Sequence, residues 1–262
     1  MLKFFGLAEK PFNITADPRY FYFTATHREA MYKIEWVVRD KQGITAIFSE
    51  PGQGKTSLAK IVAEKLSEDH RIVYITNPDF NSEMMMAKTI SYHLGIQPKR
   101  SLEAQRRAIE SIMYQQHEIG KPLVFIIDEG QLLRLKSLEV IRQLSNLEVL
   151  NEKASSFVIF GQPELRNKIN KRRALKRRVF APHTLNPLTV EDMSNLVLFR
   201  IAVAGGAPAL FPLDTLERIY RLSEGSVWIA MKICAFALQV GFNAKVPIIT
   251  PAMIDVAAKL ED

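Results

Sequence analysis

The sequence predicts an α/β domain with a central parallel sheet flanked by helices, followed by a small all-helical C-terminal part. The apolar run Ile44–Phe48 leads through a glycine-rich turn into a helical pattern, as in a strand followed by a helix. The run Leu123–Glu129 is apolar up to two final carboxylates, which is typical of a strand buried on both faces of a parallel sheet. Beyond Asn186 only helical patterns follow. A chain of 262 residues is long enough for one large domain and a smaller one.

The composition indicates a globular protein without a membrane anchor. The net charge of +7 favours an anionic partner. Cys234 is the single cysteine, which excludes an internal disulfide framework and suits a reducing cytoplasm. The apolar segment Val227–Phe242 contains Lys232 and is too short to span a bilayer comfortably, and residues 1–12 lack the apolar core of a signal peptide. We therefore expect a cytoplasmic protein with no membrane segment.

Residues 1–25 are expected to form an N-terminal arm rich in aromatic residues and prolines. Proline and the residue before it disfavour helix, so we expect an extended arm whose aromatic side chains pack against the following domain. A helix is predicted at Thr26–Arg39, with Thr26 as its N-cap and Glu29 at the capping-box position. The α/β domain is expected to cover residues 26–186 and the helical lid residues 187–262.

The turn after Ile44–Phe48 has the residues of a phosphate-binding P-loop, or Walker A motif. It contains Glu50, Pro51, Gly52, Gln53, Gly54, Lys55, Thr56 and Ser57 and leads into a helix predicted at Lys55–Ser67. The glycines let backbone N–H groups approach a phosphate, and the helix N-terminus adds a partial positive charge. Lys55 is suited to reach the β- and γ-phosphates, and the Thr56 hydroxyl to ligate Mg²⁺. Ser49 replaces the usual first glycine of the motif.

The acidic strand provides the second half of a nucleotide site. Before it, a strand is predicted at Arg71–Asn77, and helices are predicted at Asn81–Leu94 and Leu102–Glu118. The first of these helices carries three methionines, which we interpret as core filling. Asp128 and Glu129 end the acidic strand as a Walker B pattern, in which Asp128 holds Mg²⁺ and Glu129 orients the attacking water. A buried strand with a solvated acidic end is the alternative, but the P-loop upstream favours an NTPase.

The remaining elements complete the sheet and the lid. We predict helices at Ser137–Leu150 and Pro163–Ile169, strands at Ser156–Gly161 and Val179–Leu185, and lid helices at Val190–Val203, Leu213–Ser223, Ser226–Gly241 and Pro251–Leu260. Gln162 follows a strand end, and a polar residue there would lie beside the γ-phosphate, at the position called sensor 1. The segment from Arg166 to Arg178 carries eight basic residues and no acidic one.

These motifs together resemble an AAA+ ATPase. The finer resemblance is to the secretion-pathway ATPases of the GspA/ExeA kind. It rests on the stretches FFGLAEKPF (Phe4–Phe12), DPRY (Asp17–Tyr20), HREA (His27–Ala30), RQLSNLE (Arg142–Glu148) and GQPEL (Gly161–Leu165). The same ATPase type occurs among the AAA+ regulators of DNA transposition related to MuB, TnsC and TniB. Those regulators form ATP-dependent rings or filaments on duplex DNA and recruit a transposase, and the basic charge and expected lack of an anchor fit this group better.

The resemblance implies roles for further residues. It implies binding of ATP with Mg²⁺, a γ-phosphate-sensing role for Gln162, and an arginine finger at Arg178, or else at Arg177, that acts on the ATP of a neighbouring subunit. Four residues would line the adenine side of the site, namely Pro11, Phe12, His27 and Arg28. The lid usually reads G-x-P-R in the family, whereas this chain has Trp228 in place of the arginine. The sensor 2 arginine is therefore absent, unless Lys232 substitutes, and we expect slow hydrolysis that serves as a switch.

Two basic clusters are candidates for sequence-nonspecific DNA binding. One is formed by Lys99, Arg100, Arg106 and Arg107, and the other is the segment from Arg166 to Arg178. We expect duplex DNA, a transposase and a target-selector protein as partners of a homo-oligomer. The first alternative is a secretion-type assembly ATPase without a DNA role. The second is an NTP-binding signalling module that does not hydrolyse, against which the intact Glu129 and the candidate finger argue.

Overall fold

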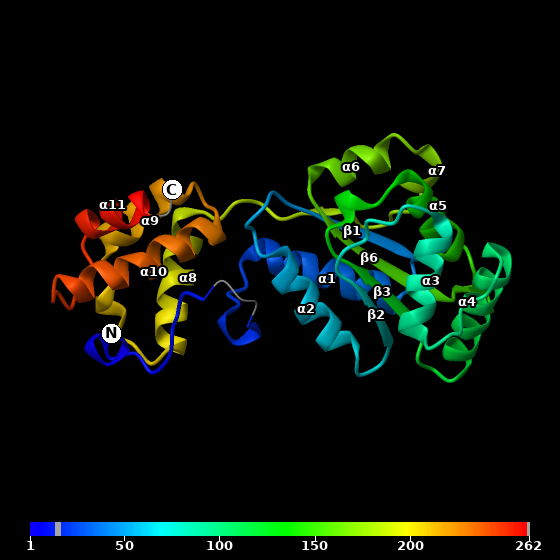
Figure 1. The fold of residues 1–262 in the computed structure, drawn as a ribbon, viewed down its shortest axis with the longest axis horizontal. Helices are drawn as coiled ribbons and strands as arrows, with labels where there is room; N and C mark the ends of the chain where they lie inside the picture. The colour runs from blue at the N-terminus through cyan, green and yellow to red at the C-terminus, as the bar shows by residue number, and fades with distance from the viewer. Residues whose placement is uncertain (14–16, 261–262) are drawn as a thin grey trace. The chain divides into compact units, whose positions relative to one another are not determined.

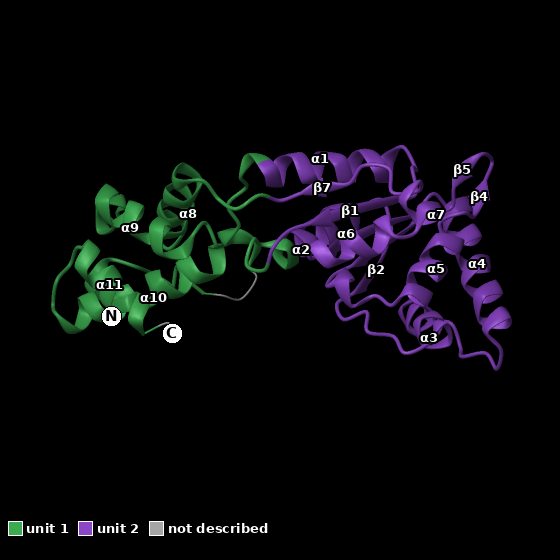
Figure 2. Ribbon diagram, turned by 90° about the horizontal axis from the view of Figure 1, so that it is seen from above, with its two compact units in different colours: residues 1–25, 51–57, 186–262 green, residues 26–50, 58–185 purple. Residues whose placement is uncertain are grey.

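A computed structural model describes residues 1–13 and 17–260 and divides the chain into two compact units (Figure 2). Unit 1 contains Met1–Ala25, Pro51–Ser57 and Asn186–Asp262, and unit 2 contains Thr26–Glu50 and Leu58–Leu185. Residues 14–16 of the predicted arm and residues 261–262 of the predicted lid lie outside the described residues. Each unit has its own hydrophobic core.

Unit 2 contains a five-stranded parallel sheet with the strand order β2-β3-β6-β1-β7. Figure 1 labels β2, β3, β6 and β1, and Figure 2 labels β7. The strands are β1 (Ile44–Phe48), β2 (Arg71–Ile75), β3 (Leu123–Ile127), β6 (Ser155–Gly161) and β7 (His183–Thr184). The accompanying helices are α1 (Ala25–Arg39), α2 (Lys55–Leu66), α3 (Glu83–Leu94), α4 (Leu102–Glu118), α5 (Leu135–Leu144), α6 (Pro163–Asn170) and α7 (Arg173–Lys176). This arrangement confirms the predicted fold class.

The centre of the sheet is covered on both faces, which explains its continuous apolar runs. All five residues of β1, of β3 and all seven of β6 are buried. The rings of Phe125 and Phe157 stack with centroids 4.5 Å apart and belong to one cluster with buried residues of α3, α4 and α5. Parallel strands need crossover connections, and where these are helices they cover the faces of the sheet. The sheet therefore provides a rigid support for the residues at its edge.

Two predicted elements of unit 2 were wrong in extent. The helix expected at Ser137–Leu150 is α5, which ends at Leu144, and it is followed by a hairpin of β4 (Glu148–Val149) and β5 (Glu152–Lys153). Leu150 and Asn151 form the tip with φ values of 50° and 68°, a left-handed conformation that a helix cannot contain. The strand expected at Val179–Leu185 is reduced to His183–Thr184 and an isolated bridge at Val179, since Pro182 has no N–H to donate to a ladder.

Unit 1 combines the N-terminal arm with the helical C-terminal part. Its helices are α8 (Val190–Val203), α9 (Leu213–Ser223), α10 (Val227–Asn243) and α11 (Pro251–Lys259). The arm forms two short 3-10 turns, η1 (Leu2–Phe5) and η2 (Pro18–Tyr20). Four of its apolar side chains are buried in the helical core of this unit, namely Phe5, Leu7, Phe12 and Tyr20. For the three aromatic side chains among them, the expected packing against the following α/β domain was wrong, because nothing in an aromatic, proline-rich stretch specifies its partner.

The Cys234 thiol lies in the core of unit 1 and is fully buried. Burial raises its pKa well above the ordinary value, which suits the packing role expected for it. Across residues 1–13 and 17–260, no helix combines the length and the apolar character needed to cross a bilayer.

Candidate nucleotide site

Each of three adjacent strands of unit 2 leads at its carboxyl end into a polar residue. β1 leads into Ser49, β3 leads into Asp128, and β6 leads into Gln162. The Ser49 N–H donates to the Gly161 carbonyl at 3.1 Å, and the Asp128 N–H donates to the Ile75 carbonyl at 2.9 Å, so both residues continue the ladder by one step. Ligands of open parallel sheets bind at this edge. The structure thus brings the predicted Walker B and sensor 1 residues to one edge of the sheet.

The phosphate-binding loop has the backbone conformation that its glycines predict. Gly52 and Gly54 have φ values of 79° and 81°, which residues with a side chain rarely adopt. A Cβ on Gly52 would lie 2.7 Å from Ser226 Oγ and 3.2 Å from Trp228 Cβ, so the backbone is also closely approached there. Lys55 begins α2 and is buried, and Thr56 is exposed. Two left-handed glycines at the start of a helix are suited to a phosphate group, so the loop fits the nucleotide that the sequence predicts.

The two Walker B carboxylates differ in their environments. Asp128 is only 2% exposed, and its Oδ1 accepts a hydrogen bond of 2.9 Å from the Glu129 N–H. Burial, together with the Asp128 charge, raises the pKa of the Tyr74 phenol on β2. Glu129 is half-buried and has φ 52°, a left-handed conformation unusual for glutamate. Non-glycine residues held in this region are found preferentially at functional sites.

Gln131 is a residue of this edge that the sequence did not single out. It lies in a 3-10 turn, η3 (Gly130–Leu132), directly after the Walker B strand. Its Nε2 donates to a Glu129 carboxylate oxygen, and its Oε1 accepts a hydrogen bond of 3.1 Å from the Gln162 N–H. A glutamine in a short loop carries no pattern of its own. Its position two residues after a Walker B glutamate is the only signal that could have identified it.

The candidate arginine fingers lie at the end of the basic segment. Arg177 is exposed and Arg178 is half-buried, both after α7. The pKa of the Glu148 carboxyl is lowered, mainly by a hydrogen bond from Lys153. The charge of Arg178 also contributes to this lowering of the pKa. Arg166 is held in place by the sheet, since its guanidinium lies 4.6 Å from the centroid of the Phe48 ring and donates to Thr184 Oγ1.

The four residues expected on the adenine side are placed as follows. In unit 1, Pro11 and Phe12 are buried, and the Phe12 ring meets Phe211 edge to face at 5.6 Å. In unit 2, His27 is buried on α1 and Arg28 beside it is exposed.

The expected DNA-binding cluster divides into two pairs. Lys99 and Arg100 are exposed in the loop between α3 and α4 and form no ion pair within residues 1–13 and 17–260. Arg107 on α4 is paired with Glu103, and Arg106 is half-buried with an Nε that has no hydrogen-bond partner among the described residues. The loop pair is therefore exposed and without an ion-pair partner among the described residues, whereas Arg107 is exposed but paired.

The sensor 2 position in unit 1 contacts the phosphate-binding loop. Ser226 is the N-cap of α10, and the Trp228 N–H donates to the Gly52 carbonyl at 3.3 Å. Trp228 is 47% exposed, and Lys232 Nζ lies 4.3 Å from the centroid of its ring. This distance is within the range of a cation–π interaction. Trp228 thus meets the P-loop through its backbone N–H, and no arginine side chain is available at this position.

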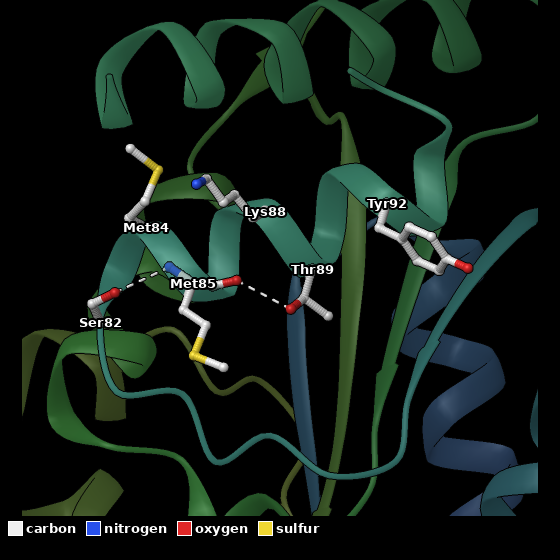
Figure 3. Close-up of a pocket in the computed structure, with 6 residues that line it drawn as sticks. All are labelled: Ser82, Met84, Met85, Lys88, Thr89 and Tyr92. Atoms are coloured by element: carbon white, nitrogen blue, oxygen red, sulfur yellow. Dashed lines mark hydrogen bonds between the residues drawn. The ribbon is translucent and has the colours of Figure 1, made fainter. Parts of the chain in front are cut away.

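A shallow pocket on α3 has a different character (Figure 3). It is lined by Ser82, Met84, Met85, Lys88, Thr89 and Tyr92, and the close-up shows these side chains along one side of the helix. Tyr92 is 83% exposed and Met85 is also exposed, whereas Met86 is fully buried. The interpretation of the methionines as core residues therefore holds for Met86 and was wrong for Met85.

Comparison with known proteins gives matches over most of the chain. A family model described as an AAA domain matches residues 38–169, half of the chain. General secretion pathway protein A of Aeromonas hydrophila is 32% identical over 243 residues, which cover 92% of this chain and 44% of that protein. The chain therefore spans less than half of the length of this relative.

Solved structures are similar in fold at low identity. ORC2 of Aeropyrum pernix, in ADPNP–ADP complexes, has a TM-score of 0.70 at 13% identity, covering 98% of this chain and 73% of that chain. ORC1 of Aeropyrum pernix, in complex with DNA, has a TM-score of 0.67 at 15% identity, covering 91% and 66%.

Proposed function

The chain belongs to the AAA domain family and is an AAA+ ATPase of the type found in general secretion pathway protein A, and from this premise we propose that it acts as an ATP-dependent, sequence-nonspecific DNA-binding regulator of DNA transposition. In this proposal it forms a ring or filament on duplex DNA and recruits or activates a transposase. ATP with Mg²⁺ is the cofactor of the family. The exposed Lys99–Arg100 loop on a chain of net charge +7 is the observation that carries the DNA role.

We assign a role in ATP binding or hydrolysis to each residue of the motifs. Residues 50–57 bind the phosphates, with Lys55 on the β- and γ-phosphates, and Thr56 and Asp128 as the Mg²⁺ ligands. Magnesium, when bound, supplies charge neutralisation on the phosphate oxygens. Glu129 orients the attacking water, and Gln162 senses the γ-phosphate.

Residues beyond the strand edge complete the proposed site. Arg178, or else Arg177, acts on the ATP of a neighbouring subunit, and the adenine side is provided by Pro11, Phe12, His27 and Arg28. We propose domain boundaries after residues 25 and 186.

The experiment that tests this function is assembly on DNA. Incubation of the chain with plasmid DNA and a non-hydrolysable ATP analogue, followed by electron microscopy, is expected to show protein rings or filaments on the duplex. ADP is expected to give naked DNA. A chain that stays monomeric and off the DNA when saturated with the analogue contradicts the proposal.

Removing the charge of the exposed loop should weaken DNA binding. The double variant Lys99→Ala, Arg100→Ala removes two exposed cations, so the slope of log affinity against log salt is expected to fall by roughly one for each phosphate that is no longer neutralised. Fluorescence anisotropy on duplexes of unrelated sequence measures both the affinity and the slope. Lys3→Ala with Lys10→Ala removes two exposed lysines of unit 1 and is the matched control. An equal loss of affinity in both double variants would mean that only net charge matters.

Hydrolysis is expected to be slow because the sensor 2 arginine is replaced by Trp228. We expect a steady-state turnover below about 10 per second, the median for enzymes. Trp228→Arg restores the family's residue at the N-terminus of α10 and should raise turnover, whereas Trp228→Ala should not. A phosphate-release assay at saturating ATP measures all three proteins, and a wild-type turnover well above that value would contradict the switch.

Assembly of a secretion apparatus is the second candidate function. The observation that favours it is the 32% identity to general secretion pathway protein A. In this case the ATPase would act through a partner protein, and the replacement of Lys99 and Arg100 by alanine would leave its ATP-dependent assembly unchanged.

A further inference from the structure

We propose that Gln131 is a positioning residue for ATP hydrolysis, whose amide holds the Glu129 carboxylate and the end of β6 at Gln162 in one fixed arrangement. The inference rests on the proposed role of Glu129 in orienting water. It concerns residues of unit 2 alone.

The amide of Gln131 uses both of its ends at this edge. Nε2 donates to the Glu129 carboxylate, and Oε1 accepts from the Gln162 N–H at 3.1 Å. An amide can donate and accept at once, whereas an apolar side chain of the same length can do neither. A single side chain therefore connects the two neighbouring strand ends that carry the candidate water-orienting and γ-phosphate-sensing residues.

The turn that carries Gln131 is itself fixed from the side of α6. Lys168 Nζ donates to the carbonyl of Gln131 and, at 3.0 Å, to the carbonyl of Leu133. Among the basic residues between Arg166 and Arg178, Lys168 is thus engaged with the backbone of η3. A charged donor to two carbonyls makes hydrogen bonds stronger than neutral ones. These contacts restrain the backbone of Gln131, and therefore the position of its Cα and the start of its side chain.

Close packing limits the turn further. A Cβ built on Gly161 would lie 2.7 Å from Leu165 Cδ2 and 3.2 Å from the Gln131 N. The backbone of the turn therefore passes directly against the end of β6. Glu129 has a flexible side chain and a left-handed backbone at φ 52°, and its own N–H is directed to Asp128 Oδ1. Within the described residues, the hydrogen bond that restrains the Glu129 carboxylate comes from the Gln131 amide.

The chemical consequence is an effect on the catalytic step and not on binding. A carboxylate must point at the water within hydrogen-bond reach to orient it, and a misplacement of about 1 Å can cost up to 10²-fold in rate. Without the amide, Glu129 samples several rotamers and only a fraction is productive. Phosphate binding by the P-loop does not involve this hydrogen bond. We therefore expect Gln131→Ala to lower kcat about tenfold and to change KM for ATP by less than about twofold.

The test compares three substitutions at one position with a matched control. Gln131→Ala removes the amide, and Gln131→Met keeps the length and fills the space without a hydrogen-bonding amide, so both are expected to lose about tenfold in kcat. Gln131→Glu keeps an acceptor for the Gln162 N–H but places a second carboxylate beside Glu129, and it is expected to lose more. Gln143→Ala on α5 is the control, because Gln143 also donates to a glutamate, Glu139, at 3.3 Å. It should retain wild-type kcat.

A double-mutant cycle separates positioning from general damage. Glu129→Gln should lose most hydrolysis and keep ATP binding, and adding Gln131→Ala to it should cost almost nothing more. An equal further loss in both backgrounds, or full activity in Gln131→Met, overturns the role of Gln131. Wild-type hydrolysis in Glu129→Gln instead overturns the proposed role of Glu129. Melting temperatures of all variants within a few degrees of wild type establish that each one is folded.

Discussion

Replacing Lys55 by alanine is expected to abolish ATP hydrolysis and to weaken ATP binding strongly. Lys55 is the first residue of α2, follows two glycines with positive φ, and is buried. Its ammonium is the only side-chain cation among residues 50–57 that could meet the charge of the β- and γ-phosphates. Since the loss of one well-placed donor costs about 10²–10³ in rate, we expect at least about 10²-fold lower kcat/KM. Steady-state kinetics and titration with a fluorescent ATP analogue measure the two effects.

Lys60→Ala provides the matched control for this prediction. Lys60 lies on the same helix, is exposed, and loses the same charge and the same methylenes on substitution. It should keep both ATP binding and hydrolysis. Similar losses in the two variants would mean that α2 tolerates no alanine, and the assignment of Lys55 to the phosphates would then be wrong.

Gly130→Ala is expected to destabilise unit 2 by overlap with its core. A Cβ at this position would lie 2.6 Å from Ile159 Cγ2, 2.9 Å from Leu165 Cδ2 and 2.9 Å from the Phe160 carbonyl oxygen. The last of these atoms is backbone, which cannot rotate away, and the side chains belong to the buried core. Overpacking of this kind costs about 1–3 kcal/mol of unfolding free energy. Thermal denaturation followed by circular dichroism measures the change.

Gly95→Ala is the control that distinguishes the cost of steric overlap from the cost of backbone strain. Gly95 ends α3 in a left-handed conformation, with φ 72°, and a Cβ there would have no neighbour within 4 Å. Its substitution should cost only the strain, about 1–2 kcal/mol. Gly130 is not among the residues of positive φ, so its cost comes from overlap alone. A melting temperature for Gly130→Ala equal to that of wild type would contradict the packing described for η3.

The nucleotide motifs could be predicted because they are local. The run Ile44–Phe48 and the loop after it specify strand, turn and helix within a few residues. Leu123–Ile127 is an apolar run that is typical of a doubly covered strand. Parallel pairing then places the ends of β1, β3 and β6 at one edge without further information.

The features that could not be predicted depend on contacts between residues distant in sequence, or on residues whose backbone conformation departs from the preference of their type. The hydrogen bond between the Gln162 N–H and Gln131 requires the relative placement of two residues that are 31 positions apart in sequence. The hairpin after α5 depends on Leu150 adopting φ 50°, against the preference of leucine. The apolar side chain of Leu150 favoured a predicted helix that continues through this residue. In the structure the chain turns there, and Leu150 is 90% exposed.

The shared core of the N-terminal arm and helices α8 to α11 has a consequence for biosynthesis. The ring of Phe12 meets Phe211, and Phe5 and Leu7 share a core with α8 to α11, so their partners are made about 200 residues later. On a ribosome that adds roughly 5–20 residues per second, these side chains wait many seconds in water before they can be buried. A nascent chain that ended before α8 would leave these apolar side chains exposed, and a chaperone that covers them would favour its yield.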